Sequence, residues 1–436
     1  MTSRVRRALD GPGGAFAAAL FLLLALLSFL AALGVFGPEG RTRLSATALY
    51  LSGGGAAAIL GGRTARARRL GSAALAALVA AGAVRLALAW VAPSNWDLDS
   101  YAIVVRAVSR GDVVYEVTDR YNYSPVWWHV LTAAAHAARA AHVPENFGFR
   151  VVATLGDALV ALGLLLHGRL TATRRRGVAR AVLWWTNPLP IAVSAFGGQF
   201  DALALGVFIL ALALAARGRS RGATLLPALV VGSAVALKQV VVAFVAGFLG
   251  FSRSWGVRLR DAALAAGPFL LLVVPYAVAL PGPVLRNVVR YASIYGLWGW
   301  YYLLRLAGVE LPFPPVFVSY AALLAGGVLA YRLVRRGDDG LAASRLAALV
   351  FFALTPGFAP QMLLWPLAFA PERREATSAA LYTLFGMIVW ADLLRLNAVN
   401  PLALLLAWAV VLAWALRALP RALRPGASRG MNPHGA

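Results

Sequence analysis

Residues 95–125 read NWDLDSYAIVVRAVSRGDVVYEVTDRYNYSP, an acidic stretch in a chain that is otherwise poor in carboxylates. The whole chain has only 17 Asp and Glu residues in 436 positions. Five carboxylates fall within 23 positions here, at Asp97, Asp99, Asp112, Glu116 and Asp119. Tyrosines are interleaved with them, at Tyr101, Tyr115, Tyr121 and Tyr123. The stretch is typical of a polar working loop between apolar segments.

The composition around this loop indicates a membrane protein. Hydrophobic residues make up 61% of the chain and charged residues 13%, whereas a soluble domain averages about 25% charged residues. The net charge of +24 does not indicate a nucleic-acid partner, because the arginines occur in short runs between apolar segments and not on one soluble face. That placement follows the positive-inside rule and makes anionic membrane lipids the expected partner. The chain has no cysteine, which excludes disulfides and thiolate chemistry.

Arginine runs also predict the side of the membrane on which the loop lies. Apolar runs at 15–36, 44–62 and 71–92 are each long enough to cross a bilayer. The first is too long for a signal-peptide core and is interpreted as a retained span. The basic connector RTARARRL at 63–70 is expected in the cytoplasm. The third span therefore ends on the outer face of the membrane, and the acidic loop that follows it is expected outside.

The loop is expected to continue to residue 149 without crossing the membrane. Residues 126–143 are predicted to form a helix in the membrane surface, with Trp127 and Trp128 at headgroup depth. If this segment crossed instead, the arginine run at 174–176 would lie outside. Residues 93–149 are therefore one external loop, and residues 281–315 form a second one.

The remaining apolar runs predict an all-α polytopic fold of about 12–14 transmembrane helices, with both termini in the cytoplasm. The segment 223–250 is expected to form two half-helices that meet near Lys238. Residues 1–70 contribute two additional spans, residues 71–420 the catalytic module, and residues 421–436 a disordered basic tail. The expected crossings after the first external loop are 150–168, 181–197, 200–216, the two half-helices, 261–280, 316–334, 341–355, 359–370, 376–391 and 399–418.

Several polar residues at the expected outer ends of spans are candidates for chemistry. Asp97 and Asp99 follow a span directly, so a half-buried carboxylate there is suited to act as a general base. Simple solvated loop carboxylates and a divalent-metal pair are the other interpretations of the two aspartates. Gln199 and Asp201 in FGGQFDAL lie at the outer end of a hairpin, where Asp201 is a site residue or a helix N-cap.

Lys238, followed by Gln239, is the only lysine and interrupts an apolar run. A lysine within the membrane needs a partner, which is a bound anion such as a phosphate or an acidic side chain. In the second external loop Arg290, Trp298 and Trp300 fit sugar stacking and phosphate clamping, or equally an interfacial aromatic belt. Gln361, in TPGFAPQMLLWPLAF, is expected at an outer membrane edge.

In their order these motifs resemble the GT-C superfamily of membrane glycosyltransferases, and specifically prokaryotic mannosyltransferase-like members. The D-L-x-x-Y pattern is matched by Asp97, Leu98 and Tyr101, and the later tyrosine patterns by Gly111 with Tyr115 and by Tyr121, Tyr123 and Pro125. NPLPIAVSAFGGQFDAL, ALKQ and APQMLLWPLAF resemble the family's later segments. The resemblance covers roughly residues 90–370, and the first two spans are an addition to it.

The resemblance implies an inverting transfer of mannose or another hexose from a polyprenyl phosphate to a lipid-linked or envelope acceptor, on the outer face of the cytoplasmic membrane. It implies that Asp97, with Asp99 as its rival, is the base. Lys238, Arg290, Gln199 and Gln361 are expected near the donor phosphate, and Tyr101, Tyr115, Tyr123, Asp201, Gln239, Trp298 and Trp300 near the substrates. No cofactor or metal is expected. A transporter or flippase for a lipid-linked glycan, with Asp201 and Lys238 as midplane charges, is the competing hypothesis.

Overall fold

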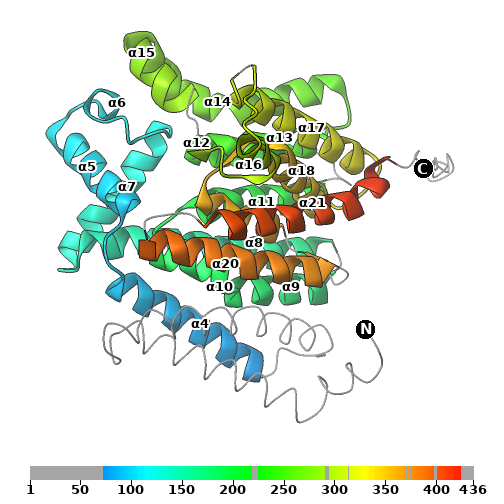
Figure 1. Ribbon diagram of the computed structural model, residues 1–436, viewed down its shortest axis with the longest axis horizontal. Helices are drawn as coiled ribbons and strands as arrows, with labels where there is room; N and C mark the ends of the chain where they lie inside the picture. The colour runs from blue at the N-terminus through cyan, green and yellow to red at the C-terminus, as the bar shows by residue number, and fades with distance from the viewer. Residues whose placement is uncertain are drawn as a thin grey trace.

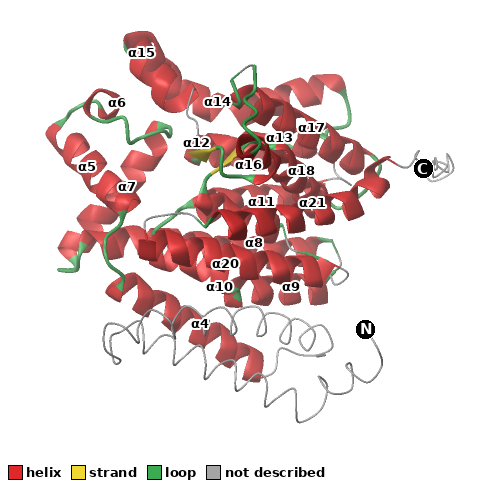
Figure 2. Ribbon diagram, in the orientation of Figure 1, coloured by secondary structure: helices red, strands yellow, loops and turns green. Residues whose placement is uncertain are grey.

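The computed structural model describes residues 72–171, 173–218, 224–289, 294–312, 314–369, 371–372, 375–396 and 400–423. Helices dominate this part of the chain, and two short strands form its one ladder (Figure 2). The two additional spans expected before residue 71 lie outside the described residues, as does the expected tail from residue 424 onward.

The first half of the described chain contains α4 (Ser72–Val91), α5 (Trp96–Arg110), α6 (Val114–Val117), α7 (Pro125–Ala140), α8 (Glu145–Leu170), α9 (Arg174–Thr186), α10 (Pro188–Pro190), the π-helix η1 (Ile191–Phe196), α11 (Asp201–Gly218), α12 (Leu225–Leu237), the 3₁₀ turn η2 (Gln239–Val241) and α13 (Val242–Leu249). The second half contains α14 (Trp255–Ala279), α15 (Pro281–Val284), η3 (Leu285–Val289), β1 (Ile294–Tyr295), α16 (Gly299–Leu306), α17 (Val316–Arg335), α18 (Gly340–Leu354), β2 (Gly357–Phe358), η4 (Pro360–Leu364), α19 (Trp365–Ala368), α20 (Ala376–Leu396) and α21 (Pro401–Leu423).

Four described helices are long and apolar enough to cross a membrane: α8, α14, α17 and α21. The number rises to six if each of two bent helix pairs is one span, namely α4 with α5, and α10–η1 with α11. Three shorter apolar segments, α12, η2 with α13, and α18, fall below the length of a full crossing, as does the part of α20 from Ala376 to Ala391. The described helices therefore fit an all-α membrane protein with several spans.

Small residues let the central helices approach closely, as in other membrane bundles. The clearest case is α8 against α11, where a Cβ added at Gly156 would lie 2.5 Å from the backbone nitrogen of Leu203. Around this pair lies a large apolar core to which α12, α13, α18, α19 and α21 contribute (Figure 1).

Buried charges attach α4 to this bundle. The Arg85 guanidinium donates to the Asp157 carboxylate of α8 at 3.1 Å, and both side chains are fully buried. Asp157 also accepts from the Ser194 hydroxyl of η1 at 3.0 Å, and Arg85 donates to the backbone carbonyl of Trp185. Because a charge inside a membrane protein needs a partner, this network determines where α4 packs.

The segment 223–250 divides at Lys238, as expected from its sequence. Helix α12 ends at Leu237, and Lys238 has extended backbone angles of φ −150° and ψ 108° before η2 and α13 begin. The expected single span 181–197 is wrong, because α9 ends at Thr186. Asn187 precedes Pro188, and a residue before proline is disfavoured in helical geometry. The chain then forms α10 and η1, which bend by 119° into α11.

Helices α5, α6 and α7 lie together beside the main bundle (Figure 1). The expected helix at 126–143 is present as α7, but its tryptophans do not face headgroups. Trp127 and Trp128 are buried, and the Trp127 ring stacks on Phe200 with centroids 3.6 Å apart. The apolar face of α7 is covered by other parts of the chain. Its tryptophans therefore pack inside the protein and not in a belt at headgroup depth.

Candidate functional site

The turn between α4 and α5 determines where Asp97 points. Asn95 caps α5, because its Oδ1 accepts from the backbone N–H groups of Asp97 and Leu98, each at 3.1 Å. Its Nδ2 donates to the Gly197 carbonyl at 3.0 Å. One side chain therefore both starts the helix and attaches the turn to the end of η1.

Asp97 faces inward toward the Gly-Gly turn that precedes α11. Gln199 Nε2 donates to Asp97 Oδ2 at 2.5 Å. Gly198 has φ +74°, a left-handed conformation that favours glycine. A Cβ at Gly198 would also lie 2.7 Å from the Leu98 side chain. The glycine thus allows the turn to approach α5 closely enough for Gln199 to reach the carboxylate.

Asp99 lies on a different side of α5. It is exposed and accepts from the Ser94 hydroxyl at 2.5 Å. Residues two positions apart on a helix point about 200° away from each other. The two carboxylates therefore do not form a joint metal site, and only Asp97 belongs to the buried cluster described here.

Lys238, at the break between α12 and η2, is buried in an ion pair with Asp201. Its Nζ donates to Asp201 Oδ2 at 2.6 Å, and Trp365 Nε1 donates to Asp201 Oδ1 at 3.0 Å. The ammonium also lies 4.8 Å from the Phe200 ring centroid and 5.2 Å from that of Tyr123. The acidic partner that the sequence left open is thus Asp201, while a role for Lys238 in phosphate binding stays a prediction. Trp365 lies in the segment APQMLLWPLAF that the sequence singled out, but it was not among the expected site residues.

The surroundings of Asp97 alter its proton affinity. Burial raises the pKa of its carboxyl group above the ordinary value. The positive charge of Lys238 and the hydrogen bond from Gln199 oppose this rise, while the charge of Asp201 adds to it. A carboxylate with a raised pKa is a stronger base than a solvated one.

The end of the acidic loop attaches to the break at Lys238. Gln239 Nε2 donates to the backbone carbonyl of Asn122 at 2.6 Å, and the Ser124 hydroxyl donates to the Ala236 carbonyl. Among the described residues, the buried Oε1 atoms of Gln199 and Gln239 have no hydrogen-bond partner. The cluster therefore offers two amide oxygens that can accept hydrogen bonds from hydroxyl groups.

Arg150, on α8, is an important residue of this region that sequence reasoning missed. Its buried guanidinium donates to the carbonyls of Ala92 at 2.9 Å and Phe196 at 2.8 Å, and it also reaches those of Ala89 and Pro93. It therefore joins the end of α4 to the end of η1, beneath the Asp97 turn. An arginine near the start of an apolar helix is the sequence signal that could have identified it.

The tyrosines of the acidic loop belong to an aromatic layer, in which Tyr121 contacts the rings of Tyr115, Tyr123 and Trp128. Tyr115 donates through its hydroxyl to the Tyr123 carbonyl at 2.7 Å. Tyr101 packs edge-on against Trp127 and Phe149. Of these expected substrate residues, Tyr123 lies closest to the ion pair, through its ring contact with Lys238.

The second expected external loop contributes less to this cluster. Trp298 is fully buried and donates to the Phe352 carbonyl at 2.7 Å, so its ring belongs to the core. Trp300 donates to the Leu354 carbonyl at 2.8 Å. Gln361 is half-buried in η4, and Arg290 lies outside the described residues. The antiparallel pairing of Ile294 with Phe358 joins this loop to the segment before Gln361.

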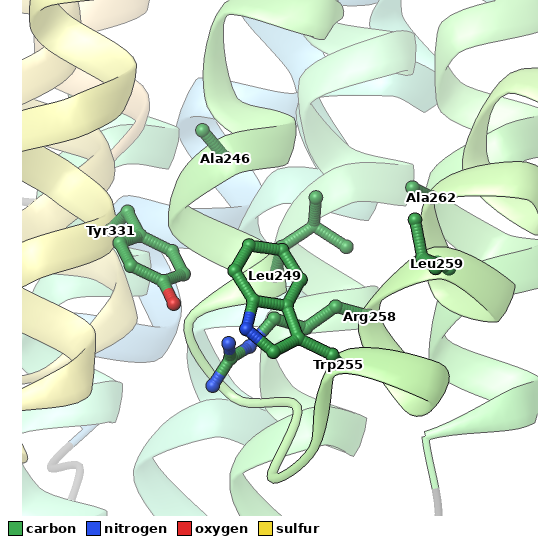
Figure 3. A pocket seen from close by; sticks show the side chains of 7 residues that line it. All are labelled: Ala246, Leu249, Trp255, Arg258, Leu259, Ala262 and Tyr331. Atoms are coloured by element: carbon green, nitrogen blue, oxygen red, sulfur yellow. The ribbon is translucent and has the colours of Figure 1, made fainter.

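A separate apolar crevice of about 180 Å³ opens between α13, α14 and α17 (Figure 3). Arg258 lies at it, with its guanidinium carbon 5.0 Å from the Trp255 ring centroid and 5.7 Å from that of Tyr331. None of the residues around Asp97 and Lys238 lines this crevice.

The candidate site is therefore one buried polar cluster, built from three chain breaks: the turn before α5, the Gly-Gly turn before α11, and the break at Lys238. No family model, curated protein or solved structure matches the chain.

Proposed function

We propose that the chain is an inverting hexosyltransferase of the GT-C type. It transfers mannose or another hexose from a polyprenyl phosphate to a lipid-linked or envelope acceptor at the outer face of the cytoplasmic membrane. The full chain then has about 12–14 transmembrane helices, with the external loops forming the site. The observation that carries the proposal is the Asp97 carboxylate, held by Gln199 beside the Lys238–Asp201 pair.

Asp97 is the general base in this proposal. It takes the proton from an acceptor hydroxyl, whose oxygen then forms a bond to the anomeric carbon of the sugar. The bond between that carbon and the phosphate oxygen breaks at the same centre, so polyprenyl phosphate leaves and the configuration inverts. The raised pKa of Asp97 supports this role, since a more basic carboxylate removes a hydroxyl proton more readily.

The leaving phosphate gains negative charge and needs cationic stabilisation more than it needs a proton. Lys238 supplies a positive charge within the cluster, although its ammonium is bonded to Asp201. We propose that the electrostatic field of the Lys238 ammonium acts on both the leaving phosphate and the Asp97 carboxylate. The unpartnered Oε1 atoms of Gln199 and Gln239 support sugar binding, because they accept hydrogen bonds from hydroxyls.

One observation favours the competing transporter. A buried ion pair at a helix break is also how transporters place ionisable groups at a central site. The two functions differ in where these residues lie, because a transporter needs Asp201 and Lys238 near the middle of the bilayer, whereas the transferase needs them at its outer boundary, facing the acidic loop. Movement of an intact lipid-linked glycan across vesicles, with no sugar transferred, would favour that function.

The experiment is a transfer assay on purified full-length protein with polyprenyl-phosphate mannose and envelope lipid acceptors. Asp97→Asn keeps the shape and the contact with Gln199 but removes the base, so we expect a loss of about 10²–10⁴-fold in kcat. Asp99→Asn is the matched control, because Asp99 is exposed on the other side of α5, and we expect it to keep most activity. Equal activity of Asp97→Asn and wild type would refute the assignment of the base.

A further inference from the structure

The apolar crevice between α13, α14 and α17 lies on a part of the fold that the proposed transfer does not use. Figure 3 shows Tyr331 of α17 on one side of it and Leu259 and Ala262 of α14 on the other, with Leu249 of α13 between them. Arg258 is the only charged residue among the described residues that line it. The crevice thus combines apolar walls with one cation.

Helix α14 presents the crevice to the membrane and not to the protein core. It is long and apolar enough to cross a bilayer, yet only 11% of its most apolar stretch is buried within the described chain. Leu259 is 67% exposed, and Trp255 at the start of the helix is 73% exposed. A tryptophan at the end of a spanning helix is typical of the membrane interface. The crevice therefore opens to lipid, near the boundary between tails and headgroups.

Two arginines converge at this end of the crevice. Arg258 Nε donates to the Ser252 carbonyl at 3.4 Å, and Arg335 Nη1, from the last turn of α17, donates to the same oxygen at 3.3 Å. Within the described part of the chain, neither arginine forms a salt bridge with an acid. Two guanidinium groups that share one acceptor repel each other, so an anion beside them is favourable.

The nearest acid does not neutralise this pair of arginines. Asp261 is fully buried, and it accepts from the Ser252 hydroxyl at 2.6 Å and from Arg260 at 2.8 Å. Asp338 and Asp339, which follow α17, line a different hollow at the end of α8. One carboxylate therefore faces three guanidinium groups, and this end of the crevice keeps a net positive charge.

We infer that the crevice binds an anionic phospholipid. An acyl chain lies between Leu259 and Tyr331, and the charged headgroup is held by Arg258 and Arg335. Arginine-rich ends of spans are expected on the cytoplasmic side, where anionic lipids give the leaflet a negative surface. The crevice shares no residue with the cluster around Asp97, so the inference does not depend on the proposed transfer.

The first test concerns the headgroup. The delipidated full chain is titrated with dioleoyl phosphatidylglycerol or dioleoyl phosphatidylcholine, and native mass spectrometry measures the lipid bound. The acyl chains are the same and only the first lipid has a net negative charge, so it should bind about tenfold more tightly. Arg258→Gln should lower that affinity by about fivefold. Arg336→Gln is the matched control, because Arg336 donates to the Ala422 carbonyl of α21, and it should change the affinity by less than about twofold.

The second test concerns the acyl chain. Ala262→Phe places a ring in the space between α14 and α17, so binding of phosphatidylglycerol should fall by about tenfold or more. Ala263→Phe adds the same ring to an exposed position of α14 that does not line the crevice. This control should bind the lipid as wild type does.

Equal affinities for the two lipids, or equal losses for the two arginine variants, would overturn the inference and indicate only a basic membrane surface. Unchanged binding by Ala262→Phe would also overturn it. A lipid-free dimer that Ala262→Phe dissociates would assign the crevice to a second copy of the chain instead. Gel filtration shows whether each variant is folded, and the comparison of the two lipids on wild type needs no substitution.

Discussion

Replacement of Gln199 by leucine isolates one interaction of the proposed base. The change keeps a side chain of similar size but removes the N–H group that donates to Asp97 Oδ2 at 2.5 Å. A hydrogen bond to a charged group contributes about 1.5–3 kcal/mol. That energy favours the ionised form of Asp97, so its loss raises the proton affinity of the carboxyl group further.

The expected effect is a displacement of the pH profile. A base acts when it is deprotonated, so transfer is present above the pKa of Asp97 and is lost as pH falls through it. Since about 1.4 kcal/mol corresponds to one pH unit, the acid limb of kcat/KM should move upward by about one to two pH units in Gln199→Leu. At a fixed pH below the limb, transfer should fall by about 10- to 100-fold.

The assay is the initial rate of hexose transfer from polyprenyl phosphate by detergent-solubilised protein across a pH series. Gln239→Leu is the matched control, because Gln239 bonds the Asn122 carbonyl and not Asp97. The control should keep the wild-type midpoint even if its KM increases. An unmoved acid limb in Gln199→Leu, or an equal displacement in both variants, would refute the reasoning.

Two further predictions concern the framework of the site. Lys238→Met leaves Asp201 buried without its cation, so the free energy of unfolding should fall by about 3–5 kcal/mol. The double variant Lys238→Met with Asp201→Leu should recover most of that loss in thermal unfolding, and a double variant no more stable than the single one would contradict a buried pair. Asn95→Ala should lower stability by about 1 kcal/mol through the lost cap and should also lower kcat. Asn95→Asp keeps the capping oxygen but loses the bond to Gly197, so it should lower kcat with a smaller stability change, as steady-state kinetics beside thermal unfolding would show.

Much of the helical architecture could be predicted from local patterns. The segment 223–250 predicted two half-helices that meet near Lys238, because it is too long for one span and too short for two, and α12 does end at Leu237. The prediction of a single span over 181–197 failed at Asn187, where the proline that follows ends α9 early. It also failed for the orientation of α7, since a tryptophan pair has the same pattern whether it faces lipid or the protein core.

In the candidate site, too, some features could be predicted from the sequence and others could not. Composition and the positions of arginine, aspartate and lysine by themselves determined a helical membrane protein with a few polar residues at its helix breaks. Tertiary structure alone decided that Asp97 faces Gln199 while Asp99 faces Ser94, and that Lys238 pairs with Asp201. It also decided that Arg150 joins the ends of α4 and η1. The physical reason is that a local pattern indicates which groups need partners, whereas the partner chosen depends on how helices distant in sequence are rotated and packed.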